Sequence, residues 1–157
     1  MRMCFLVACA FLGGSCRQRV SPVSWNSKSG KFTWWRGEVT LPVGLRYRGV
    51  PSDTFEGRFT SPDGKLVIRH DIGGYAGAYA SRRDAFSFEE RVVEGARVWT
   101  ARRYRGRATL MAVTFPDSGC ANFFLESSRI EDAAVIDSIA RSFQPKGRDE
   151  PSPSLCN

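Results

Sequence analysis

The sequence predicts an α+β fold, a curved antiparallel β-sheet built as a meander of hairpins with one C-terminal helix packed on one face. Two observations lead to this class. Residues 31–126 consist of short alternating segments separated by turn residues, with little helical periodicity. Residues 128–143 carry the one clear helical pattern. An all-β sandwich is the structural alternative.

The strands follow from alternation and turn chemistry. In the first hairpin, Pro62 has the backbone angle of the second turn position, and Gly64 accepts a positive φ. The second hairpin turns at Arg105-Gly106, and the chain turns again after Pro116. The expected strands are 55–60, 66–72, 97–103, 108–115 and 121–126.

The helix is predicted from its ends and its apolar stripe. Ser128 is expected to cap its start, with Glu131 completing a capping box, and Pro145 ends it. The stripe consists of Val135, Ile136, Ile139 and Phe143. Such a stripe is suited to lie across a sheet.

The first sixteen residues have the pattern of an export signal. Arg2 precedes an apolar run from Cys4 to Leu12, and small residues follow up to Cys16. The run matches the hydrophobic region of a signal peptide, about 7 to 15 residues. It falls short of the roughly 20 residues that span a bilayer. We therefore expect a protein exported to the cell envelope.

The residues before Cys16 resemble the lipobox of bacterial lipoproteins, in which small residues precede a cysteine that is lipidated after cleavage. The family pattern has leucine or a similar residue where this chain has Gly13, with Leu12 one place earlier. Lipidation at Cys16 is the favoured interpretation and implies a membrane anchor, with plain secretion as the alternative. No histidine or acid lies near Cys4, Cys9 and Cys16, so no metal site is expected there.

The domain organisation follows from these segments. We expect a signal peptide at 1–16, a flexible Ser-rich tether at 17–30, a single domain at 31–144 and a disordered tail at 145–157. An oxidising compartment permits a disulfide between Cys120 and Cys156. A free Cys156 near the chain end is the open alternative.

Two resemblances add to this picture. Phe143, preceded by Ile136-Asp137-Ser138-Ile139 after a meander, resembles the closing element of PsbP/Mog1-like domains over Val39 to Phe143. A second pattern resembles one found in small uncharacterised bacterial secreted proteins and lipoproteins. Its residues are Leu41-Pro42, Gly44, Asp53, Gly57, Asp71-Ile72-Gly73 and Ala76-Gly77. Neither resemblance implies catalytic residues.

The candidates for catalysis are Asp53, His70 and Asp71. Histidine suits acid–base chemistry because its pKa lies near neutrality. Alternation, however, places His70 with Ile68 on the apolar face and Asp71 on the opposite face, so the two groups do not converge. We therefore expect a buried core histidine and a non-enzymatic protein, with a small secreted hydrolase as the alternative.

The glycine-rich stretch from Gly73 to Gly77 follows a strand, as phosphate-binding loops do. It lacks the Lys-Ser/Thr of a P-loop and the spacing of a dinucleotide fingerprint. A sharp turn is the favoured interpretation, and no cofactor is expected. Tyr75 and Tyr79 lie beside this turn, where they are placed to line a shallow pocket.

The basic charge suggests an anionic partner. The formal net charge is +7, from 23 basic and 16 acidic residues. The candidate anion-binding residues are Arg97, Arg102, Arg103, Arg105 and Arg107, with Trp99 and Tyr104 among them. The alternative is a solvated hairpin in an arginine-rich protein. The expected function is thus an envelope module that binds an anionic lipid, a glycan or a protein. Export argues against nucleic acid.

Overall fold

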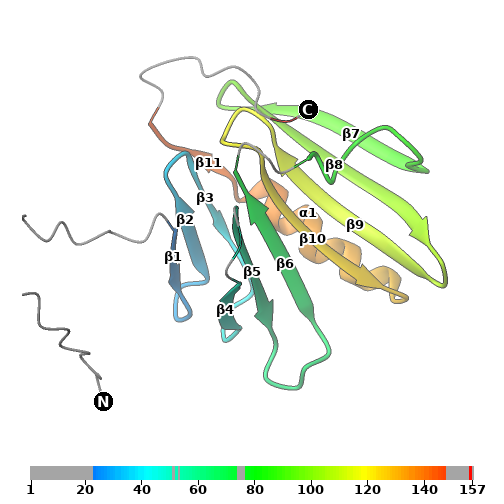
Figure 1. Cartoon of the computed structure of the whole chain (residues 1–157), viewed down its shortest axis with the longest axis horizontal. Coiled ribbons are helices and arrows are strands. Elements are labelled where there is room, and N and C mark those ends of the chain that lie inside the picture. Colours follow the sequence, from blue (N-terminus) through cyan, green and yellow to red (C-terminus); the bar gives the residue numbers. More distant parts are fainter. Residues whose placement is uncertain (1–22, 51, 53, 74–76, 148–155, 157) are drawn as a thin grey trace, which may run out of the picture.

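The computed structural model describes residues 23–50, 52, 54–73, 77–147 and 156 (Figure 1). Antiparallel strands form two sheets, and a short helix lies near the C-terminal end of the domain. This arrangement confirms the predicted α+β class. Among the described helices, none is long and apolar enough to cross a membrane.

The larger sheet has seven strands. They are β4 (Arg46–Val50), β5 (Phe55–Thr60), β6 (Val67–Ile72), β7 (Ser87–Val93), β8 (Ala96–Arg105), β9 (Ala108–Phe115) and β10 (Ala121–Ser127). The β5–β6 and β8–β9 hairpins and the β9–β10 pair are confirmed. A simple meander is wrong, because the order is β4-β5-β6-β10-β9-β8-β7. The chain leaves β6, starts again at the far edge with β7, and returns to place β10 beside β6.

The smaller sheet contains four strands. They are β1 (Val23–Asn26), β2 (Lys31–Trp34), β3 (Gly37–Thr40) and β11 (Gln144–Pro145), in the order β1-β2-β3-β11. The expected tether is therefore wrong from Val23 onward, because β1 pairs with β2. The expected tail is wrong at Pro145, which pairs with Gly37 of β3. The rest of the tether, the signal segment and most of the tail lie outside the described residues.

The helix α1 (Ala133–Arg141) follows a 3₁₀ turn at Ile130–Asp132. The predicted cap at Ser128 is wrong. Instead, Asp132 holds the turn. It accepts a hydrogen bond from the Ser127 hydroxyl at 2.5 Å and forms an ion pair with Arg129 at 2.7 Å. These side-chain contacts let the chain turn once before the helix begins.

One face of the seven-stranded sheet, here called the inner face, is covered by α1 and the smaller sheet. Figure 1 shows α1 lying behind β9 and β10. The core on this face is aromatic and dry: Phe32, Trp34, Phe59, Phe115 and Phe123 are at most 1% exposed. The predicted helix stripe joins it through Ile136, Ile139 and Phe143.

The opposite, outer face is partly covered by residues 77–86, the described end of the connection between β6 and β7. A small apolar cluster lies between this covering segment and the sheet. It contains Ala80, Ala101, Leu110, Ala112 and Phe124. The rest of the outer face carries charged side chains from β4, β5 and β6, and there the candidate site lies.

Candidate binding site on the outer face

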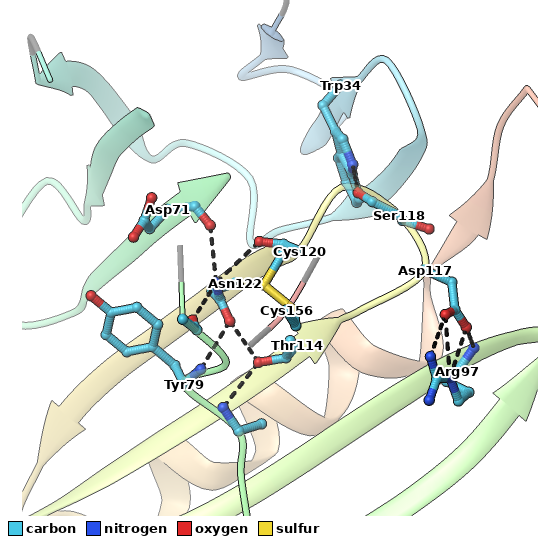
Figure 2. Close-up of a disulfide and its surroundings, with 12 residues drawn as sticks. Trp34, Asp71, Tyr79, Arg97, Thr114, Asp117, Ser118, Cys120, Asn122 and Cys156 are labelled. Atoms are coloured by element: carbon cyan, nitrogen blue, oxygen red, sulfur yellow. Dashed lines mark hydrogen bonds and ion pairs between the residues drawn. A yellow bond between two sulfur atoms is a disulfide. The ribbon is translucent and has the colours of Figure 1, made fainter. Parts of the chain in front are cut away.

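Asn122 fixes the covering segment to the sheet (Figure 2). Its side chain is fully buried. Its oxygen accepts hydrogen bonds from the Tyr79 amide at 3.1 Å and the Thr114 hydroxyl at 2.6 Å, and its nitrogen lies 3.1–3.3 Å from the carbonyls of Asp71, Gly77 and Cys120. Thr114 in turn accepts from the Ala80 amide at 2.9 Å. One asparagine thus replaces the strand pairing that this loop backbone lacks.

A disulfide joins Cys120 to Cys156 beside this network (Figure 2). The pairing left open by the sequence is therefore present in the structure. It fastens the chain end next to the turn that precedes β10, where Cys120 has a φ of 49°. A cross-link of this kind stabilises the fold by restricting the unfolded chain.

A hollow of about 390 Å³ opens between the covering segment and strands β4–β6. Its lining includes Glu56, Arg58, Arg69, Asp71, Tyr79 and Phe124. Tyr79 stacks on Phe124 with ring centroids 4.2 Å apart and an interplanar angle of 11°. Arg103 donates to the Tyr79 carbonyl at 2.6 Å, which holds the tyrosine backbone over the sheet. The predicted pocket-lining role of Tyr79 is confirmed, and Tyr75 lies outside the described residues.

Three arginines cross this face in one row. The strand register places Arg48 opposite Arg58 and Arg58 opposite Arg69. All three side chains are exposed. Within the described part of the chain, none has a carboxylate within 4 Å. We call this row the arginine ladder.

Two carboxylates form the neighbouring row. Glu56 lies directly opposite Asp71. Asp71 is only 8% exposed, and its Oδ1 atom is buried without a hydrogen-bond partner. Burial raises the pKa of the Asp71 carboxyl; a hydrogen bond from Thr54 opposes this shift, and the charge of Glu56 adds to it. Figure 2 shows the Asp71 carboxylate and the Tyr79 ring on the same side of Asn122.

The structure confirms His70 as a core histidine. It is 1% exposed on the inner face, where its ring centroid lies 4.9 Å from that of Phe32. Its Nε2 atom is 3.2 Å from the Tyr47 hydroxyl. Burial lowers the pKa of His70 to about 4. His70 and Asp71 point to opposite faces, so they do not form an acid–base pair, and Asp53 lies outside the described residues.

The predicted arginine cluster on the second hairpin is not gathered into one site. Arg97 forms a two-pronged ion pair with Asp117, with a shortest distance of 2.7 Å. Three other arginines have partners elsewhere. Arg102 forms an ion pair with Asp137, and Arg105 forms one with Glu126. Arg103 donates to the Tyr79 carbonyl, and Arg107 is exposed. Arg102 belongs to the inner face. Arg105 also lines the hollow.

Comparison of the chain with protein-family models, with curated proteins and with solved structures found no match. The resemblances to PsbP/Mog1-like domains and to small bacterial secreted proteins therefore stay predictions. Among the described residues, no group of three histidine, cysteine or acidic side chains is placed to hold a metal ion. The functional argument rests on the geometry of the outer face.

Proposed function

We propose that the chain is a non-enzymatic binding module of the bacterial cell envelope. Its outer face binds a phosphate or carboxylate group of an envelope component. Export and lipid attachment at Cys16 belong to this proposal and rest on the leader pattern. The observation that carries the binding role is the arginine ladder.

The arginine ladder lowers the stability of the fold unless an anion binds to it. Like charges directly opposite one another on neighbouring strands destabilise a sheet. Here Arg58 faces an arginine on both sides. Guanidinium groups bind phosphate and carboxylate through two parallel hydrogen bonds, so an anion converts this repulsion into attraction.

The geometry suits an extended or branched anion. Neighbouring strands are about 4.8 Å apart, so a row over three strands spans roughly 10 Å. The hollow beside Arg58 and Arg69 adds a concave wall, which a flat basic patch lacks. The hydrolase alternative, which uses Asp53, His70 or Asp71, has less support, because His70 is buried in the aromatic core on the face opposite Asp71.

Binding of the full chain to polygalacturonate and to inorganic phosphate tests this proposal. We expect Arg58→Gln combined with Arg69→Gln to weaken binding about 10-fold or more, because each change removes charge-assisted hydrogen bonds. Arg141→Gln, an exposed arginine on the helix that covers the inner face, is the matched control. Equal affinity of the double variant and the control would overturn the proposal.

A further inference from the structure

The outer face separates its charges into rows of like sign. Glu56 faces Asp71 in one row, and Arg58 faces Arg69 in the next. Opposite charges directly across from each other stabilise a sheet, whereas both of these pairs place like charges across from each other, which destabilises it. The rows are two residues apart along each strand, which is roughly 7 Å. The hollow therefore has an acidic end and a basic end.

The acidic end lacks a cation of its own. Neither Glu56 nor Asp71 forms an ion pair with a described residue. The only side-chain hydrogen bond to Glu56 comes, among described residues, from Thr54 at 3.3 Å. Asp71 is more than nine-tenths buried, and its Oδ1 atom has no partner. A buried carboxylate in this state is unfavourable until a positive charge reaches it.

The wall between the two ends is aromatic. Tyr79 lines the hollow beside Asp71, and its stacking on Phe124 fixes the ring. An aromatic ring attracts an ammonium group electrostatically, through the negative potential of its face. The acidic end thus offers two carboxylates, and the phenol ring lies on the wall that leads to it, which is a suitable environment for a cation.

We propose that the hollow binds a zwitterion, with an ammonium group at Glu56 and Asp71 and a phosphate group at Arg58 and Arg69. The aminoethyl phosphate group has this chemistry, with its two charges separated by two carbons. It occurs on lipid headgroups and as a substituent on glycans. The inference rests on the proposed function, because it assigns the anion to the same arginines.

The test compares three probes on the full chain by titration calorimetry: O-phosphoethanolamine, inorganic phosphate and ethanolamine. We expect phosphoethanolamine to bind about 10-fold more tightly than phosphate, since one added charge-assisted contact is equivalent to about that factor. Asp71→Asn removes this advantage and leaves phosphate binding in place. Glu56→Gln reduces it as well, and Glu131→Gln, at an exposed acid within the 3₁₀ turn, leaves it unchanged.

Equal affinity for phosphoethanolamine and phosphate in the unaltered chain would overturn the inference, as would an unchanged ratio in both Asp71→Asn and Glu56→Gln. The proposed function fails separately, if phosphate binding does not depend on Arg58 and Arg69. Vesicles in which phosphatidylethanolamine replaces phosphatidylglycerol distinguish the two sources. Binding to them assigns the group to lipid, and binding of the free probe without binding to vesicles excludes the lipid source.

Discussion

The two faces of the seven-stranded sheet come from the same strands and follow opposite rules. The inner face packs aromatic rings against the helix and the smaller sheet, and its one histidine is held neutral. The outer face keeps charged rows, a buried polar network and a carboxylate, that of Asp71, whose Oδ1 atom has no hydrogen-bond partner. The difference supports our proposal that the inner face provides stability, while the outer face gives up some stability for binding.

The largest difference is expected at adjacent residues of β10. Phe123 is fully buried on the inner face, whereas Phe124 is 8% exposed beside the hollow on the outer face. Phe123→Ala should lower the free energy of unfolding by about 3–5 kcal/mol, because it leaves a cavity in a closed aromatic core. Phe124→Ala should lower it by about 2 kcal/mol. Urea denaturation measures both, and equal losses would contradict the distinction between the faces.

The pH dependence of stability should be governed by the inner face. The pKa of His70 falls from 6.5 in the unfolded chain to about 4 in the fold. Between these values His70 is protonated in the unfolded chain and neutral in the folded chain. Its contribution to the free energy of unfolding is therefore fully present above pH 6.5 and is lost as the pH falls toward 4. The loss approaches about 3 kcal/mol. Denaturation midpoints measured across this range should decline.

His70→Gln is the control for this slope, because glutamine does not titrate. Its stability should no longer decline toward pH 4, since the raised pKa of Asp71 acts in the opposite direction. Further down, Glu38 adds a second loss. Its ion pairs with Lys31 and Lys146 lower its pKa from 4.5 to about 2, so its contribution disappears as pH falls through that interval. An undiminished slope in His70→Gln would show that another group is responsible.

A smaller, local effect is expected from Asn122. Asn122→Ala removes the side-chain partner of the half-buried Tyr79 amide and of the Gly77 carbonyl, at a cost of about 2 kcal/mol. Hydrogen exchange should quicken at the amides of Tyr79 and Ala80 while the amide of Phe32 in β2 changes little. Asn26→Ala, at the last residue of β1, where the side chain accepts from the Lys28 amide, serves as the control and should leave both outer-face amides protected.

The smallest effect is a gain. Asp71→Asn should raise the free energy of unfolding at neutral pH by about 1 kcal/mol, because it removes a buried charge whose pKa the fold has raised. Thermal melting detects the shift. A lower melting temperature would mean that the Asp71 carboxylate stabilises the outer face, contrary to the comparison of the two faces.

The local parts of this fold are predictable from the sequence. The Ser61–Gly64 turn has the expected hydrogen bond from the Gly64 amide to the Ser61 carbonyl at 2.9 Å, and it fixes the β5–β6 register. The pairing of β10 with β6 is not predictable in this way, because it joins segments about fifty residues apart with no shared turn. The strand β11 was missed for the same reason, since it joins β3 from a distant part of the chain. The β1–β2 and β2–β3 pairs are local, and β1 was missed because the polar, Ser-rich composition of residues 17–30 suggested a tether.

The site was predicted less well than the fold. A run of arginines close in sequence suggested one anion site on the second hairpin, but alternation sends Arg102 to the inner face, and Asp117 and Glu126 neutralise two others. The arginine ladder is spread over three strands and shows no sequence cluster. A signal was nevertheless present, because the Ser61–Gly64 turn places Arg58 opposite Arg69 once the hairpin register is worked out.

The central claim is that the outer face gives up stability for binding, and the Arg58→Gln, Arg69→Gln double variant tests it most directly. Its melting temperature and its affinity for inorganic phosphate are measured on the same sample. The account predicts a melting temperature equal to or above that of the unaltered chain, together with an affinity about 10-fold lower. A lower melting temperature with unchanged affinity would contradict it.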